Sequence, residues 1–435
     1  MGRPHDAKRR RQGYLAISAV SLAAVLAVSA CSGTASSSSG SGSSTSVAPI
    51  KIGLSVELTG NTAPFGVPAA EAIQLTVNAI NAAGGIKELG GAKLQLDEAD
   101  NMSDPTTAGQ QLRQEAADGV VAFLGPMSSS SDSANKSLIE QLKVPLFAPS
   151  LTDAVTDDNT NGYIFRTVLP ASGWTPAAIT YLKQLETSKN TPIKRIGIVG
   201  TTVSPGPEVV GAWEAAAKAN GWAPTVVTYD PSATTNYAPQ IAKLKAADVQ
   251  VVVGLQLADA TPFAQAAKAA GYQPSYGWLW IAGGQYTNSF KSSLGSYVNN
   301  WLVMSYTGAV NTSQFPPAVR QIAQAFQAKE GQPLNGLYAA AASGVALIAD
   351  AVAKAKSRNP QQVAAAARTL NFTNASQSEY PYYMMPGGVK FDSSQSNTNW
   401  PAPIIQLAGT NDQIIVYPNQ YSTGSVVWPL PSPAS

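Results

Sequence analysis

Hydrophobic positions along the chain follow two periodicities, one typical of buried strands and one typical of helices. In the first half, 50–55 and 120–124 are short apolar runs, whereas 68–83 carries apolar residues at helical spacing. Strands that alternate with helices at this spacing predict βαβ units and a parallel sheet. The predicted strands are 50–55, 93–97, 120–124 and 145–148, and the predicted helices are 68–83, 105–118 and one that ends near 142.

The same alternation starts again at residue 195, which predicts a second α/β domain. A body that continues to residue 418 is too long for one ordinary core and fits two domains. The predicted strands are 195–200, 224–229, 249–255 and 278–281, and the predicted helices are 207–220, 237–246 and 258–270. Three Ala-rich helices at 314–329, 334–356 and 361–370 follow, and then short strands at 389–391 and 404–407. We expect the proline-rich end of the chain to be frayed.

The chain begins with a basic segment, an apolar segment and a lone cysteine. Four consecutive basic residues at 8–11 precede an apolar run of 17 residues from Tyr14 to Ala30, and Cys31 is the only cysteine. This is the layout of a secretory signal peptide. The run is short for a membrane span, which needs roughly 20 predominantly apolar residues. We therefore predict that 1–30 is a signal peptide.

The cysteine at the end of this segment resembles the bacterial lipobox, in which diacylglycerol alkylates the thiol and the cysteine becomes the first residue of the mature chain. An uncleaved anchor helix or a chance cysteine is the alternative. The basic head, the small residues before Cys31 and the Ser-rich stretch after it agree with the lipobox. Residues 31–49 would then be a lipidated, flexible Ser/Gly-rich tether. We expect the protein to be lipid-anchored on the extracytoplasmic face of the cell membrane.

Removal of 1–30 changes the charge and the chemistry that remain. It takes away the only histidine, five basic residues and one acid, which leaves 23 basic and 25 acidic residues and a net charge near −2. Without histidine, and with Cys31 as the only thiol, the body has no Ser-His-Asp or Cys-His catalysis, no His or Cys metal site and no disulfide. No basic patch indicates nucleic-acid binding. The composition therefore favours a binding protein without cofactor or metal over an enzyme, although carboxylate catalysis stays open.

Three polar loops follow predicted strands of the first half, at the edge where open parallel sheets bind ligands. These are the loop 58–66 with Phe65, the serine-rich turn 125–132 with Ser129 and Ser130, and the turn 148–153 with Ser150 and Thr152. Hydroxyl and free N–H groups at a helix start suit an anionic or carbonyl oxygen. Each loop alone also has a plainer interpretation: an aromatic core plug, an N-cap with spare serines and an ordinary polar turn.

An ordered set of short segments covers about residues 50–418. The segments are Leu58-Thr59-Gly60, Phe65-Gly66, 78–86, Asp100, Asp104-Pro105, Gly125 with the serine run, 148–152, 165–167, 195–199 and 389–392. Together they resemble the branched-chain amino-acid (Leu/Ile/Val) binding protein family, which are type I substrate-binding lipoproteins of ABC importers.

The resemblance implies an α/β fold with two Rossmann-like lobes that have central parallel sheets. This is the type I periplasmic-binding-protein fold, in which three crossovers join the lobes and the lobes close over a ligand. Lobe one would contain 50–170 and 305–386, and lobe two would contain 171–304 and 387–435.

The resemblance also assigns ligand contacts in lobe one. By similarity, Ser129 and Ser130 would hydrogen-bond a ligand carboxylate or an equivalent oxygen. Ser150 would contribute mainly its backbone carbonyl, and Thr152 its hydroxyl and N–H. Phe65 falls where the family often has an aromatic wall.

The predicted second lobe departs from the family pattern. The family usually carries Tyr-Gly after the strand 195–200, where this chain has Val-Ser-Pro-Gly at 203–206. The family's acid for the ligand ammonium falls near 284–285, where this chain has no carboxylate. A buried ammonium without a counter-charge is costly, so we expect a neutral or carboxylate ligand rather than a free α-amino acid. The candidate contacts from this lobe are Gln256, Gln285, Tyr286 and Trp280.

We expect a substrate-binding lipoprotein of an ABC importer that captures an amino-acid-like, amide or carboxylate solute by lobe closure. It would act as a monomer and deliver the solute to an ABC permease in the same membrane. The alternative is an extracellular sensor domain that feeds a signalling partner, and a cell-wall enzyme with Asp/Glu catalysis ranks last. Permease dependence would favour the first hypothesis, and turnover of a product would favour the last.

Overall fold

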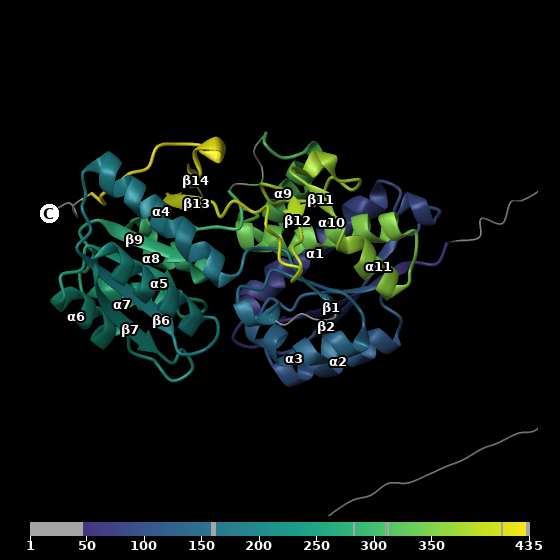
Figure 1. The fold of residues 1–435 in the computed structure, drawn as a ribbon, viewed down its shortest axis with the longest axis horizontal. Coiled ribbons are helices and arrows are strands. Elements are labelled where there is room, and N and C mark those ends of the chain that lie inside the picture. The colour runs from purple at the N-terminus through teal and green to yellow at the C-terminus, as the bar shows by residue number, and fades with distance from the viewer. Residues whose placement is uncertain are drawn as a thin grey trace, which may run out of the picture. The chain divides into compact units, whose positions relative to one another are not determined.

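The computed structural model describes residues 47–157, 162–281, 283–308, 310, 313–409 and 412–431. The predicted signal peptide 1–30, Cys31 and most of the tether lie outside these residues. Val47–Ser435 form one compact unit. Within this unit, strands and helices alternate and build two main sheets (Figure 1), which confirms the predicted α/β class with parallel central sheets.

The first main sheet is entirely parallel and has the strand order β2-β1-β3-β4-β5. Its strands are β1 (Ile50–Val56), β2 (Leu94–Asp100), β3 (Ala122–Leu124), β4 (Leu146–Ala148) and β5 (Ile164–Arg166). The inner strands are buried along their length, because helices cover both faces of the sheet. All five strands direct their carboxyl ends to the same edge.

Helices on both faces complete this part of the molecule. One face carries α1 (Ala63–Ala82), α9 (Pro317–Glu330), α10 (Gly336–Ala355) and α11 (Pro360–Ala367), and the other carries α2 (Pro105–Ala117) and α3 (Ser129–Leu142) (Figure 1). Among the described residues, α10 is the one helix that is long and apolar enough to cross a membrane, and 94% of its apolar window is buried inside the protein. A helix that is apolar all round and buried in this way is a core helix. Its Gly344 allows this packing, because a Cβ there would lie 2.3 Å from Leu124 Cδ1.

The second main sheet has the strand order β14-β13-β10-β9-β8-β6-β7. Its parallel strands are β6 (Arg195–Thr201), β7 (Ala223–Tyr229), β8 (Val251–Leu255), β9 (Gly277–Ile281) and β10 (Leu302–Met304), and its antiparallel strands are β13 (Ile404–Ala408) and β14 (Asp412–Tyr417). Its helices are α4 (Ala171–Lys189), α5 (Gly206–Asn220), α6 (Ala238–Ala246), α7 (Ala260–Ala269) and α8 (Asn288–Leu294). The sequence pattern misses α4, because Gly173 and Pro176 in its first turns are typical of loops.

The chain crosses three times between the part of the molecule built around the first main sheet and the part built around the second. The first passage leads from β5 into α4, and the second leads from β10 to α9. Before the third passage, β12 (Val389–Lys390) pairs with β11 (Asn371–Phe372), and Ser396 pairs with Arg166 at the edge of the first sheet. The chain joins the second sheet only at β13. The third passage therefore lies between Asn397 and Ile404, later than the boundary at 386/387 expected from the sequence.

The C-terminal segment packs onto the second sheet and is not frayed as far as Leu430. The Trp428 side chain is 6% exposed, and its Nε1 donates to Thr191 Oγ1 at 3.1 Å. Gly277 in β9 leaves room for the indole, since a Cβ there would lie 2.9 Å from Trp428 Cζ3. The expectation of a frayed end was wrong as far as Leu430, because it weighed the prolines and not the buried tryptophan before them; 432–435 lie outside the described residues.

We expect Trp428→Ala to lower the free energy of unfolding by about 3–5 kcal/mol, because it removes a buried indole and leaves a cavity. Urea unfolding of residues 47–435 measures this change. The adjacent Val427, whose side chain is 42% exposed, provides the control Val427→Ala, which we expect to change stability by less than about 0.5 kcal/mol. Equal changes in the free energy of unfolding for the two substitutions would contradict the packing of Trp428 against the second sheet.

A buried acid lies beneath the first sheet. Glu115 of α2 is 3% exposed, and neither of its carboxylate oxygens has a hydrogen-bond partner among the described residues. A Cβ on Gly53 of β1 would lie 2.3 Å from Glu115 Oε2, so glycine is needed where α2 meets the strand. Burial, together with the negative charges of Asp97 and Asp118, raises the pKa of Glu115 from its ordinary 4.5 to about 8. The acid is therefore held protonated at neutral pH.

This raised pKa predicts a pH dependence of stability. Between about pH 5 and pH 8 the folded chain retains a proton that the unfolded chain has lost, so the free energy of unfolding falls as the pH rises. We expect Glu115→Gln to reduce this fall and to stabilise the protein at pH 8, by on the order of a few kcal/mol at most. Urea unfolding from pH 5 to 8 checks this, with the exposed Glu214→Gln as control. A variant with the slope of the natural protein would contradict it.

Candidate functional site

Polar side chains gather at the carboxyl ends of the strands in both main sheets. In the first sheet they follow β1, β3, β4 and β5, and in the second sheet they follow β6, β7, β8 and β9. This is the edge at which open parallel sheets bind ligands. Contacts between the two edges show that they face each other in this structure.

The structure brings the predicted serines at 129 and 150 together. Ser129 begins α3, and its Oγ accepts hydrogen bonds from Leu151 N at 3.0 Å and from Ser150 Oγ at 3.2 Å. Ser150 is buried. Ser130, in contrast, is exposed and its hydroxyl lies 2.7 Å from that of Ser128. The serine-rich turn therefore contributes Ser129 to the polar cluster, while Ser130 faces solvent.

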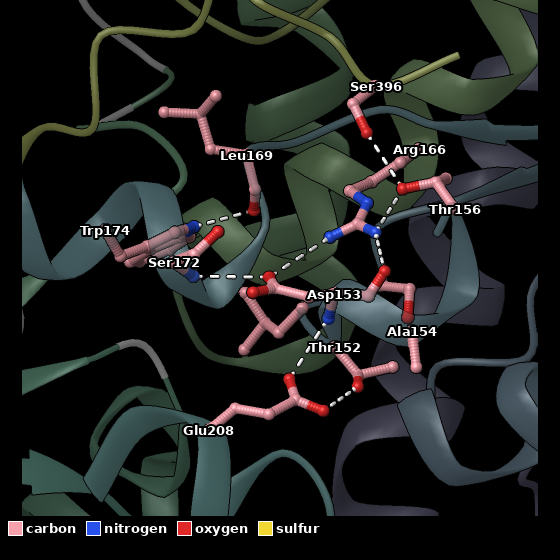
Figure 2. Close-up of polar contacts among 12 residues, drawn as sticks. Thr152, Asp153, Ala154, Thr156, Arg166, Leu169, Ser172, Trp174, Glu208 and Ser396 are labelled. Carbon is pink, nitrogen blue, oxygen red and sulfur yellow. Dashed lines mark hydrogen bonds and ion pairs between the residues drawn. The ribbon is translucent and has the colours of Figure 1, made fainter. Parts of the chain in front are cut away.

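Thr152 makes the contact that joins the carboxyl edges of the two main sheets. Its hydroxyl donates to Glu208 Oε1 at 2.5 Å, and the backbone N–H of Asp153 donates to Glu208 Oε2 at 3.0 Å. The hydroxyl of Ser204 in turn donates to Thr152 Oγ1 at 3.2 Å. Glu208 lies in the first turn of α5, just after β6, and Figure 2 shows it pointing from that helix to Thr152. Both carboxylate oxygens of Glu208 thus accept hydrogen bonds from the loop that follows β4 of the first sheet.

Arg166, at the end of β5, is the buried cation of this cluster. Its Nη2 donates to the carbonyl oxygen of Asp153 at 2.9 Å and to Thr156 Oγ1, and Nη1 lies 3.9 Å from Asp153 Oδ1 (Figure 2). The Thr156 and Ser396 hydroxyls are 3.0 Å apart. Burial lowers the pKa of Arg166 to about 10, against the charge of Asp153. The guanidinium therefore stays positive at neutral pH and holds the loop after β4, whose Thr156 contacts Ser396 in the segment before the third passage.

Two buried acids lie behind the serines. Glu57 follows β1 and accepts from Met127 N at 3.1 Å, while its other oxygen has no partner among the described residues. Asp132 in the first turn of α3 is 1% exposed, and neither oxygen of its carboxyl group has a hydrogen-bond partner among the described residues. Burial raises the pKa of both acids, and the charge of Glu57 raises that of Asp132 further. This side of the site is rich in carboxyl groups.

The predicted contacts from the second sheet differ in their surroundings. Gln256 is buried after β8 and donates through Nε2 to Tyr229 Oη at 2.8 Å, and Tyr229 donates to the buried acid Asp259. Gln285 is fully buried, and neither polar atom of its amide has a partner among the described residues. The Tyr286 side chain lies outside what the structure describes. Trp280 packs in the core against Trp278 and Phe263.

Phe65 lies at the start of α1, where the predicted aromatic wall would stand. Its side chain is 6% exposed and belongs to the main hydrophobic core. The structure therefore shows contacts expected of a core residue at this position.

The sequence interpretation missed Glu208, Arg166 and Asp132 as members of the cluster. A signal for Glu208 was present, since an acid stands in the first turn of a helix that follows a predicted strand directly. Among the described residues, no group of three or more Asp or Glu side chains is placed to hold a metal ion. The cluster offers hydroxyls, amides, N–H groups and carboxyl groups, a set suited to the recognition of a small polar molecule.

Comparison with known proteins supports this interpretation. Residues 49–409 match the family model of the periplasmic binding proteins. The Leu/Ile/Val-binding protein homolog 8 of Brucella abortus (strain 2308) is 29% identical over 386 residues, which cover 86% of this chain and 91% of that protein.

Two solved structures share the fold. The branched-chain amino acid transporter substrate binding protein LivJ of Streptococcus pneumoniae str. Canada MDR_19A, in complex with isoleucine, has a TM-score of 0.70 and 19% identity, and covers 85% of this chain and 100% of its own. A fatty acid ABC transporter substrate-binding protein from Thermomonospora curvata has a TM-score of 0.68 and 20% identity, and covers 87% and 95%.

The fold is therefore that of the type I periplasmic binding proteins. The chain belongs to the periplasmic binding protein family. The resemblance to the Leu/Ile/Val-binding proteins seen in the sequence is confirmed. The family consists of substrate-binding proteins and not of enzymes, as the composition led us to expect.

We expect Arg166→Gln to lower the free energy of unfolding by about 3–5 kcal/mol, because it removes one partner of a buried charged cluster. Arg195 provides a matched control, since it also pairs with an aspartate but is 43% exposed beside an 85% exposed Asp248. We expect Arg195→Gln to cost less than about 1 kcal/mol. Urea unfolding of both variants measures the difference. Similar losses of stability would contradict a larger contribution of the buried cluster.

Proposed function

We propose that this protein is the substrate-binding lipoprotein of an ABC importer and captures a small solute between the carboxyl edges of its two main sheets. The observation that carries the proposal is the contact of Glu208 with Thr152 and Asp153. It brings the polar edges of the two sheets face to face at the position where an α/β sheet binds ligands. Membership of the family and its solute-binding relatives supports this assignment.

The sequence supports a membrane anchor for such a receptor. The signal-peptide layout at 1–30 ends at Cys31, and a Ser/Gly-rich tether follows. Acylation of Cys31 would hold the protein on the extracytoplasmic face, since each buried CH₂ contributes about 0.8 kcal/mol. The flexible tether would let the binding unit, as a monomer, reach a permease in the same membrane.

The three chain passages suit a hinge between two lobes. The proposed lobe one contains 50–170 and 305–397, and the proposed lobe two contains 171–304 and the chain from Ile404. The shift of the third boundary from 386/387 follows from the pairing of Ser396 with Arg166. Opening and closing about three adjacent passages is the motion expected of proteins that enclose a solute.

The proposed ligand contacts come from both edges. Ser129, Ser150 and Thr152 supply hydroxyl and backbone groups, and Gln256 and Gln285 supply amides. Phe65, Ser130 and Tyr286 remain proposed contacts from the family resemblance. One relative in this fold was solved with isoleucine and another is named for fatty acids, so the fold leaves the solute open. The candidates are amino-acid-like solutes, amides and carboxylates.

A thermal-shift screen of residues 47–435 tests the function, with amino acids, amides, and aliphatic and aromatic acids as probes. A solute at 100 times its dissociation constant stabilises a one-site protein by about 2.7 kcal/mol. We expect Ser129→Ala and Thr152→Ala to reduce this stabilisation. Ser137→Ala, at an exposed position of the same helix α3, should leave it unchanged.

Two outcomes would contradict the proposal. A solute that binds equally well to the Ser129 and Thr152 variants binds elsewhere, and the site assignment then fails. Uptake of the bound solute that does not depend on an ABC permease would exclude the importer role and favour the sensor alternative.

A further inference from the structure

The carboxylate of Glu208 occupies donors that a ligand carboxylate would need. One oxygen accepts from the Thr152 hydroxyl, and the other accepts from the N–H of Asp153. A hydroxyl and a backbone N–H, each directed at one oxygen, form the kind of charge-assisted pair that binds carboxylates well. Figure 2 shows that the Glu208 side chain reaches these donors from α5, which follows β6 of the second main sheet. The chain thus supplies its own carboxylate at this position.

The charges around these donors also oppose a second carboxylate. Arg166 is already engaged with Asp153, through the carbonyl at 2.9 Å and the carboxylate at 3.9 Å. Two acids, Glu57 and Asp132, are buried behind the serines, and burial raises the pKa of both. A ligand acid at this position would therefore meet the Glu208 carboxylate at the donors that this carboxylate already fills. Like charges at this range cost free energy in a partly dry site.

Groups on the second sheet fit an uncharged head group instead. Neither polar atom of the Gln285 amide has a partner among the described residues, and Gln256 Oε1 also lacks one. Gln256 follows β8, which is the neighbour of β6, the strand that leads to Glu208. Buried amides that offer both a donor and an acceptor are satisfied by a ligand amide, which offers the same pair.

We infer that Glu208 is a specificity-determining residue that fills the carboxylate position of the site from within the chain, so that the bound solute carries an uncharged polar head such as an amide and no free carboxylate. This inference rests on the proposed function and narrows its solute class. Glu208 acts both as the contact that closes the two edges and as the group that rejects acids.

Propionate and propionamide test the inference without knowledge of the natural solute. In Glu208→Ala, the donors of Thr152 and Asp153 are free, and we expect propionate to raise the thermal midpoint of residues 47–435 in a saturable way. Propionamide should act alike on the natural protein and on Glu208→Ala, and sodium chloride at equal ionic strength should not reproduce the propionate effect. The natural protein and Glu214→Ala, which removes an exposed acid from the same helix, should not respond to propionate.

Further variants keep the test decisive. Adding Thr152→Val to Glu208→Ala should abolish the propionate response. If Glu208→Ala fails to fold, Glu208→Gly is measured in the same way, with refolding yield in propionate against propionamide as readout. An equal propionate response in the natural protein, or none in either Glu208 variant, overturns the inference.

The solutes themselves give a second measure by isothermal titration. For each acid and amide pair with a common side chain, we expect the natural protein to bind the amide at least about tenfold more tightly, the value of one charge-assisted hydrogen bond. Glu208→Ala should lose this preference. A preference for acids in the natural protein overturns the inference but leaves the proposed function intact. Propionate rescue without binding of any screened solute contradicts the proposed function alone.

Discussion

The arrangement of the site depends on one buried guanidinium. Arg166 stands at the last position of the first sheet's edge strand β5, fully buried, and a charge in such a place must be paired. Its partners are Asp153 and Thr156, in the loop that also carries Thr152. The backbone of Arg166 bonds to Gln395 and Asn397 on both sides of Ser396. One residue thereby fixes the ligand-facing loop, the sheet edge and the start of the third passage.

The electrostatic character of the site follows from this arrangement. Arg166 lies beside Asp153, and two of its nitrogens, like oxygens of Glu57 and Asp132, are buried without a hydrogen-bond partner among the described residues. Burial disfavours the charged form of these two acids and so raises the pKa of each. Glu208 lies between the two edges, and both of its carboxylate oxygens accept hydrogen bonds from the loop after β4.

Much of the fold could be predicted from the sequence, because continuous apolar runs and helical periodicity reflect the burial of whole elements. These two patterns predict the alternation of strands and helices from β1 to β4 and from β6 to β9. The residues of the site were harder to predict from the sequence. Ser129 and Thr152 could be proposed because they follow strands, but Ser130 turns to solvent. Glu208 stands at a helix start after a strand, but its partner Thr152 lies 56 residues earlier in the chain, and the sequence gives no sign of that pairing. The late third passage and the buried Trp428 also depend on partners that are distant in the chain.

The pairing of residues 395–397 with β5 has a consequence for neighbouring molecules. An open edge of a sheet exposes unpaired N–H and C=O groups and can recruit strands from other copies. In this protein a short return segment covers that edge of the first sheet, with bonds from Arg166 N to Gln395 O at 2.9 Å and from Asn397 N to Arg166 O at 3.0 Å. The same segment that precedes the crossing to the other sheet thus also protects this edge from pairing with strands of other copies.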